Sequence, residues 1–140
     1  MLERTLLMVK PDAVRRGLIG EIVSRVEHKG FKIIGLKMVQ FNQAIAEDFY
    51  REHLQKPFFP DLFAFMTSGP AAAMVLEGEN VVSVTRLMMG KTKYIDAEPG
   101  TIRGDFAHNL TENVVHGSDS PESSAREIAI LFKEGELYQR

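Results

Sequence analysis

Apolar residues gather in short runs that predict four β-strands. Residues 5–9 are apolar almost throughout, which is typical of a central strand covered on both faces of a sheet. Residues 31–41 alternate imperfectly between apolar and polar, and residues 71–77 are rich in alanine. A fourth strand is expected over residues 113–118, where two β-branched valines are adjacent.

Between these runs, apolar residues recur every three or four positions, which predicts amphipathic helices. We expect helices over residues 19–29, 42–53, 80–89 and 121–132, and a shorter one that buries Phe59, Leu62, Phe63 and Met66. The helix over 80–89 is expected to turn Leu87 inward along with its valines. Asn42 and Ser120 are expected N-caps, Pro121 suits a first helical position, and Gly30 suits a left-handed helix end.

This order of elements predicts an α/β (α+β) sandwich of the split ferredoxin-like type. Such a fold has a four-stranded antiparallel sheet with covering helices, which we expect on one face. A long loop, residues 90–112, precedes the last strand, and loops of that length are usually functional or disordered. The sequence has no internal repeat and no linker, so residues 1–140 are expected to form a single domain.

Composition narrows the class of protein and of ligand. The hydrophobic fraction of 44% is that of a folded globular protein. The net charge of −2 gives no general attraction to nucleic acid or anionic membrane, so a polyanion must be held by local cations. The chain has no cysteine, which excludes disulfides, zinc–thiolate sites and cysteine nucleophiles. Residues 1–4 show no signal-peptide pattern, and residues 71–76 are too short to span a bilayer, so we expect a soluble cytoplasmic protein.

The candidate chemistry centres on His116, at the end of the predicted last strand. Gly117 removes side-chain bulk beside it, and a helix begins close by at Ser120. A helix N-terminus offers N–H donors to an anion, and neutral imidazole is a nucleophile that can accept a phosphoryl group. Glu127, on the border of the last helix's apolar stripe, either orients this ring or is an ordinary surface carboxylate. A histidine in a turn more often has no catalytic role, so the rest of the chain must decide.

Other candidate residues also allow both a functional and a structural interpretation. Lys10 ends the central strand and either reaches into a site or is solvated. Phe58 either stacks on a planar ligand or packs in the core, and Tyr50 favours packing. Arg86, near a helix C-terminus, either clamps phosphate or contacts the helix dipole. Gly90-Lys91-Thr92 resembles the end of a Walker A loop, but the earlier glycine and strand are missing, so phosphate must be bound in another way.

The chain carries four motifs, which are Lys10-Pro11-Asp12, Lys56-Pro57-Phe58-Phe59, Pro99-Gly100-Thr101-Ile102-Arg103-Gly104-Asp105 and Asn113-Val114-Val115-His116-Gly117-Ser118-Asp119-Ser120. In order and spacing they resemble those of the nucleoside diphosphate kinase family, over essentially the whole chain. One such motif would be a weak sign, whereas four collinear motifs are specific.

The resemblance implies an enzyme that moves the terminal phosphate of a nucleoside triphosphate, such as ATP or GTP, to a nucleoside diphosphate in a ping-pong cycle. His116 matches the family's phosphorylated histidine, with the phosphate on its pros nitrogen. The residues that match its ligands for phosphates and sugar hydroxyls are Lys10, Arg86, Thr92, Arg103 and Asn113. Those that match the base site are Phe58, Leu62 and Leu110, and those that position the histidine are Tyr50, Glu127 and Ser118. Mg²⁺ is implied as a cofactor that enters on the nucleotide's phosphates, without a direct protein ligand.

The residue types agree with phosphoryl transfer. Its transition state spreads negative charge over phosphoryl oxygens, which cations such as Lys10, Arg86 and Arg103 can stabilise. Stacking tolerates any base because every base has a π-face. No cluster of Asn or Gln near Phe58 is placed to read a base edge, so broad base specificity is expected.

Three other classes of function fit less well. An RNA-recognition module needs aromatics on its central strands, and residues 5–9 have none. A serine hydrolase built from Ser118, His116 and Asp119 would place its triad too close together in sequence, and the Gly-x-Ser-x-Gly motif is missing. A zinc site from His108 and His116 has no third ligand in view.

Lys93-Tyr94-Ile95 departs from the family pattern, which mostly has Asn-Pro at the first two of these positions. The length is unchanged, so Thr92 and Arg103 keep their register. In the family this loop contacts neighbouring subunits, so the resemblance implies a homo-oligomer built from dimers. Tetramer and hexamer both fit, and a dimer stays open. No membrane partner is expected, and no nucleic acid is required.

Overall fold

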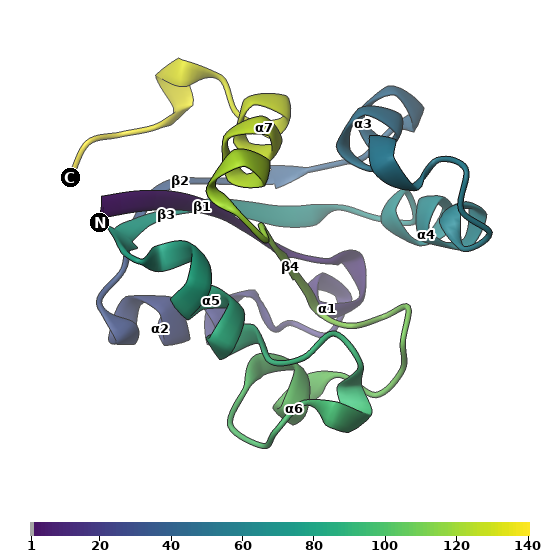
Figure 1. The fold of residues 1–140 in the computed structure, drawn as a ribbon, viewed down its shortest axis with the longest axis horizontal. Coiled ribbons are helices and arrows are strands. Elements are labelled where there is room, and N and C mark those ends of the chain that lie inside the picture. Colours follow the sequence, from purple (N-terminus) through teal and green to yellow (C-terminus); the bar gives the residue numbers. More distant parts are fainter. Residues whose placement is uncertain (1) are drawn as a thin grey trace.

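A computed structural model describes residues 2–140 of the protein (Figure 1). Over these residues the strands are β1 (Leu2–Val9), β2 (Lys32–Val39), β3 (Ala71–Glu79) and β4 (Val115–Gly117). They form one four-stranded antiparallel sheet in the order β2-β3-β1-β4. The predicted α+β fold with an antiparallel sheet is confirmed.

β1 lies inside the sheet, paired with β3 on one side and with β4 on the other. Its last four residues are fully buried. Leu6 and Met8 enter one core, and Leu7 and Val9 enter the other, because successive side chains of a strand point to opposite faces. This is the burial that the continuous apolar run predicted.

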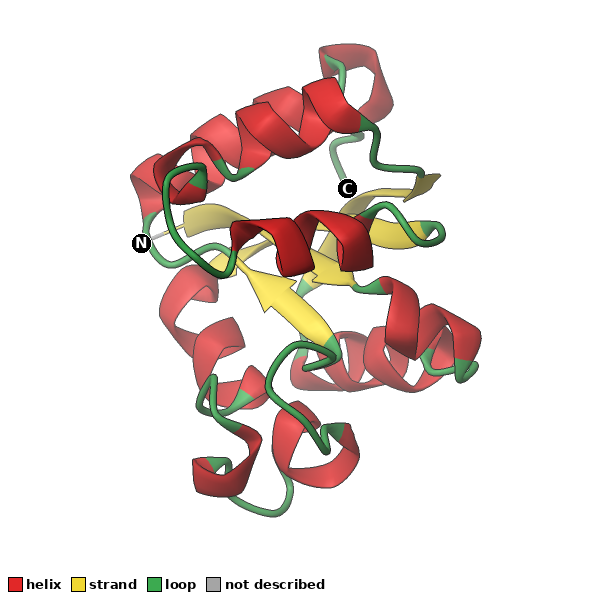
Figure 2. Cartoon of the chain, turned by 90° about the vertical axis from the view of Figure 1, so that its right-hand side faces the viewer, coloured by secondary structure: helices red, strands yellow, loops and turns green. Residues whose placement is uncertain are grey.

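Helices cover both faces of the sheet. Those that pack with Leu6 and Met8 are α3 (Gln43–Phe49), α4 (Phe59–Met66) and α7 (Pro121–Leu131). Those that pack with Leu7 and Val9 are α1 (Pro11–Arg15), α2 (Ile19–Lys29), α5 (Val81–Met89) and α6 (Ile102–Phe106). In Figure 1, α7 and α3 lie above the sheet and α2, α5 and α6 below it, and Figure 2 shows the strands between helical layers. The prediction of helices on one face is wrong because the central strands are apolar on both sides, and both sides must be buried.

The predicted caps are present. The Asn42 side chain accepts a hydrogen bond from the Ile45 amide at 2.9 Å, and the Ser120 hydroxyl accepts one from the Ser123 amide at 3.0 Å. Pro121 is the first residue of α7. Gly30 ends α2 with a φ of 104°, in the left-handed region that favours glycine. These short-range signals set the helix ends because they act between residues close in sequence.

Other boundaries differ from the prediction. The helix expected over 42–53 ends at Phe49, and a 3₁₀ turn (Arg51–His53) follows. The long loop contains a 3₁₀ turn (Tyr94–Asp96) and α6, and a further 3₁₀ turn (Glu134–Glu136) follows α7. Leu87 is 76% exposed, because α5 buries the stripe of Val81, Thr85 and Met89. Within residues 2–140 no helix has the length and apolar character needed to cross a membrane.

Candidate active site

His116 lies in the middle of β4, opposite Met8 of β1. The strand was predicted to begin at Asn113. It begins instead at Val115, directly after a tight turn. Val114 has a φ of 77°, and the Val115 amide donates to the Asn113 carbonyl at 2.8 Å, which makes a γ-turn. A β-branched residue in this region is strained, so tertiary contacts must hold it. One of these is the Lys10 amide, which donates to the Val114 carbonyl at 2.9 Å.

Gly117 lets α5 pack closely on β4. A Cβ atom at Gly117 would collide with the sulfur of Met89, near the end of α5. Because the helix lies so near, the Arg86 guanidinium reaches the strand and donates to the Gly117 carbonyl at 3.2 Å. Gly117 was expected to remove side-chain bulk beside His116, and the structure shows that α5 occupies the space this leaves.

A cleft of about 300 Å³ opens beside His116. Its lining includes ten of the twelve predicted site residues, which are Lys10, Tyr50, Phe58, Leu62, Arg86, Thr92, Arg103, Asn113, His116 and Glu127. They come from elements far apart in the sequence, so the fold brings them together. A larger and more apolar hollow of about 580 Å³ lies between Leu2 and Phe132. It holds none of the predicted site residues, and the chemistry therefore belongs to the smaller cleft.

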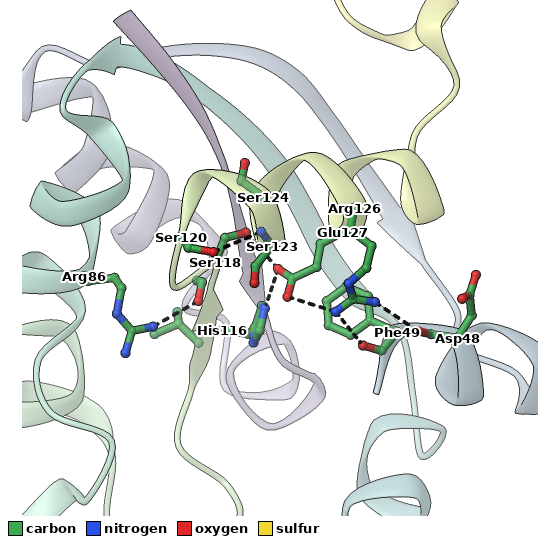
Figure 3. Close-up of polar contacts among 12 residues, drawn as sticks. Asp48, Phe49, Arg86, His116, Ser118, Ser120, Ser123, Ser124, Arg126 and Glu127 are labelled. Atoms are coloured by element: carbon green, nitrogen blue, oxygen red, sulfur yellow. Dashed lines mark hydrogen bonds and ion pairs between the residues drawn. The ribbon is translucent and has the colours of Figure 1, made fainter. Parts of the chain in front are cut away.

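The ring of His116 is held by a buried carboxylate (Figure 3). Its Nε2 lies 2.9 Å from Oε1 of Glu127, and the Ser118 hydroxyl donates to the same oxygen at 2.7 Å. Glu127 is only 6% exposed, so it is not an ordinary surface glutamate. A proton on Nε2 satisfies this bond and leaves the lone pair on Nδ1. Burial lowers the pKa of His116 below its ordinary value, although Glu127 opposes the shift, so the ring is neutral near pH 7.

Buried cations stand on the other side of the cleft. The Lys10 ammonium donates to the Asn113 side chain at 2.8 Å, and burial, reinforced by Arg103, lowers the pKa of Lys10 to about 8. The Arg103 guanidinium donates to the carbonyls of Asn113, Gly90 and Val115 at 3.3, 3.0 and 2.8 Å. Burial and the nearby Arg86 lower the pKa of Arg103 to about 10. An anion in the cleft would offset the repulsion between these charges.

Phe58 stands at the mouth of the cleft. It is 50% exposed, so it is not a core residue. The ring centroids of His53 and Phe58 lie 5.4 Å apart, and the Lys56 ammonium lies 5.8 Å from the centroid of the Phe58 ring. Leu62 lines the cleft on the next turn. An exposed aromatic ring backed by a cation suits stacking on a planar ligand.

Comparison with known proteins shows the family to which the chain belongs. The family model described as "Nucleoside diphosphate kinase" matches residues 3–137. The chain is 58% identical to the nucleoside diphosphate kinase of Thermus thermophilus over 97% of this chain and 99% of that protein. It is 57% identical to the nucleoside diphosphate kinase of Carboxydothermus hydrogenoformans, over 97% of this chain and 91% of that protein. The chain belongs to the nucleoside diphosphate kinase family. It is therefore an enzyme, a nucleotide-binding phosphotransferase, as the resemblance implied.

Solved structures of nucleoside diphosphate kinases share the fold. The enzyme of Halobacterium salinarum in complex with CDP has a TM-score of 0.97 at 48% identity, and covers 100% of this chain and 93% of its own. The orthorhombic form of the Aquifex aeolicus enzyme has a TM-score of 0.95 at 42% identity, and covers 98% and 99%. The protein therefore has the fold of this family along its length.

Two predicted site residues do not line the cleft. Ser118 is fully buried, and its hydroxyl donates a hydrogen bond to Glu127. Leu110 is 61% exposed and lies outside the lining. Tyr50 both lines the cleft and packs in the core, and its hydroxyl has no hydrogen-bond partner among residues 2–140. Burial, and then the charge of Glu127, raise the pKa of Tyr50, so its hydroxyl stays neutral.

The cleft also contains residues that the sequence did not single out, which include Phe49, Glu52, His53, Ser123 and Arg126. The ring of Phe49 lies edge-on to His116 at 5.1 Å. The signal for several of them was adjacency, since Phe49 precedes Tyr50 and Arg126 precedes Glu127. The departing segment Lys93-Tyr94-Ile95 follows Thr92 but does not itself line the cleft, and Ile95 is exposed.

Proposed function

We propose that the protein transfers the terminal phosphate of a nucleoside triphosphate to a nucleoside diphosphate by a ping-pong mechanism through a phosphohistidine on His116. One observation carries this proposal. The His116 ring is held at Nε2 by a buried carboxylate, and cationic side chains line the same cleft. Because Nε2 is engaged, Nδ1, the pros nitrogen, is the atom that takes the phosphate.

In the first half-reaction the lone pair on Nδ1 attacks the terminal phosphorus of the triphosphate. An N–P bond forms, the P–O bond to the diphosphate breaks, and the diphosphate leaves with that electron pair. Positive charge that develops on the ring is stabilised through Nε2–H by Glu127, which Ser118 holds in place. In the second half-reaction the terminal oxygen of another diphosphate attacks the phosphorus, the N–P bond breaks and His116 is restored.

The charged residues are proposed to act on the phosphates. A loose phosphoryl transition state needs positioning and charge stabilisation more than covalent help. Lys10, Arg86 and Arg103 supply positive charge beside His116, and Thr92 and Asn113 supply neutral polar groups for phosphate oxygens and sugar hydroxyls. Arg103 already uses three donors on backbone carbonyls, so two of its five N–H groups remain for a phosphate.

The base is proposed to stack on Phe58, with Leu62 as an apolar neighbour. A π-face attracts every base, so broad base specificity follows. Leu110 lies outside the cleft lining, so its contact with the base is proposed from the family resemblance alone.

Mg²⁺ is proposed to enter with the nucleotide, as a complex with its phosphates. The cleft suits such a complex, because the carboxylates of Glu52 and Asp119 line it and Mg²⁺ prefers oxygen donors. These two residues would hold the ion's water shell. When bound, the ion neutralises charge on the phosphates.

We further propose that residues 1–140 act as one domain, that the protein works in the cytoplasm, and that it assembles as a homo-oligomer. Support for assembly comes from β2, an outer strand on which Leu36 and Met38 are each 53% exposed. Apolar residues on an outer strand favour pairing with another chain. Neither a membrane nor a nucleic acid is needed for the proposed reaction.

The test is incubation with ATP labelled at the terminal phosphate. Label should appear on the protein, withstand alkali and be lost in acid, as for a phosphoramidate. His116→Ala should take up no label and should lose exchange between ATP and other diphosphates, while its fold stays intact. His28→Ala, which alters a histidine on α2 outside the cleft, is the matched control. Appreciable exchange by His116→Ala would overturn the proposal.

A further inference from the structure

Arg126 joins two parts of the candidate site. It precedes Glu127 on α7, and its guanidinium extends toward the end of α3 (Figure 3). Nη1 donates to the Asp48 carbonyl at 3.2 Å and Nη2 to the Phe49 carbonyl at 3.4 Å. The same Nη2 lies 3.8 Å from Oε2 of Glu127. One side chain therefore contacts both the carboxylate that holds His116 and the neighbouring helix end.

The two carbonyls lie at the C-terminal end of α3, where a positively charged side chain stabilises a helix. They belong to the last turn of α3, where backbone carbonyls lack partners within the helix. A cation there also meets the negative end of the helix dipole. The α3 helix has no basic residue in its own last turn, so Arg126 of α7 supplies the charge from outside.

The segment fixed in this way carries the aromatic wall of the cleft. We call residues 43–66, from α3 to α4, the aromatic hairpin. Phe49 lies against His116, Tyr50 lines the cleft, and Phe58 stands at its mouth. In Figure 1 the hairpin lies at the far end of the sheet from the two chain termini. Its placement relative to His116 therefore depends on contacts such as those that Arg126, on α7, makes with the end of α3.

We propose that Arg126 is a positioning residue that holds the aromatic hairpin at the distance from His116 that a nucleotide needs. This inference rests on the proposed function, since it takes the cleft as the nucleotide site. Arg126 acts through Phe58, while its own hydrogen bonds go to the Asp48 and Phe49 carbonyls. Without the guanidinium, the base-stacking ring is less well placed, while the His116–Glu127–Ser118 contacts persist.

The experiment measures the Kd of ADP with Mg²⁺ by titration calorimetry, which needs no catalytic turnover. Arg126→Gln should raise the Kd about tenfold, the equivalent of one charge-assisted hydrogen bond. In a Phe58→Ala background the same change should raise the Kd by less than about threefold, because the ring it positions is gone. Arg126→Lys, which keeps the charge but not the fork of donors, should fall between wild type and Arg126→Gln.

Arg51→Ala is the matched control. Arg51 also contacts Asp48, through its carboxylate at 2.8 Å, but lies outside the cleft lining, so the Kd should not change. An unchanged Kd for Arg126→Gln, or an equal rise with and without Phe58, would overturn the inference. If Arg126→Gln does not fold, the comparison is made with Arg126→Lys. The acid-labile label on wild-type protein tests the proposed function separately, because it reports on His116 and not on the hairpin.

Discussion

At the scale of single residues, the cleft buries cations that water would otherwise solvate. Lys10 is 8% exposed and Arg103 is 5% exposed. Burial of a positive charge costs free energy unless a partner offsets it, and here the partners are an amide oxygen and backbone carbonyls. An anionic ligand bound in the cleft would offset this cost, because it would interact favourably with both buried cations.

Lys10 gives the activity a predicted pH dependence. Its pKa of about 8 means that the ammonium loses its proton as the pH rises through that value, so kcat/KM should fall on the alkaline side. Lys10→Ala should lose about 2–4 kcal/mol of transition-state stabilisation and should lack this alkaline limb. Rates measured between pH 6 and about 10 for wild type and variant provide the check.

Lys10→Arg is the control, since an arginine keeps its charge and should move the limb to higher pH. A limb that persists in Lys10→Ala belongs to another group.

The contribution of Lys10 to folding stability should change with pH in the opposite direction from the activity. Between about 8 and the ordinary 10.5 the unfolded chain binds more protons than the folded one, so this residue's contribution to the free energy of unfolding rises with pH.

Phe58 tests the proposed breadth of base specificity. Phe58→Ala should weaken adenine, guanine and pyrimidine nucleotides together by about 1–3 kcal/mol each, because an aromatic face reads no donor–acceptor pattern. Nucleotide titrations at fixed Mg²⁺ measure this, and melting curves serve as the control. Loss of affinity for a single base would mean that the cleft reads a base edge.

At the scale of elements, α7 supplies much of the site, since it carries both Arg126 and Glu127. Its start is set by the Ser120 cap and by Pro121 at the first position. The cap therefore fixes the start of the helix that holds Glu127.

Ser120→Ala should lower the free energy of unfolding by about 1 kcal/mol, because one helix amide loses its partner. Urea unfolding at a fixed protein concentration measures the change. Ser120→Asp keeps an acceptor at the cap and should retain most of the stability. Equal midpoints for Ser120→Ala and wild type would show that the cap contributes little.

At the scale of the whole molecule, the outer strand β2 leaves apolar side chains exposed. We therefore expect light scattering after size-exclusion chromatography to give a tetramer or a hexamer of the 15.7 kDa chain. Dilution should leave the mass unchanged if the interface is extensive. A mass of one chain at every concentration would contradict the proposed assembly.

The sequence by itself determined the features that depend on near neighbours. The apolar run that became β1, the caps at Asn42 and Ser120, and the left-handed Gly30 all arise from residues a few positions apart. The family and its enzyme class were also predictable, because four collinear motifs carry them. These features needed no knowledge of what lies across the fold.

The tertiary structure alone decided what depends on contacts between distant segments. The γ-turn at Val114 opposes the preference of a valine, and it is held by the amide of Lys10 more than a hundred residues earlier. Burial of Glu127, exposure of Leu87 and helices on both faces follow from how elements pack, which periodicity does not specify. Arg126 is the clearest case. Nothing near it in sequence indicates that its guanidinium binds the end of α3, because the partners are carbonyls that any sequence has and only the fold brings near.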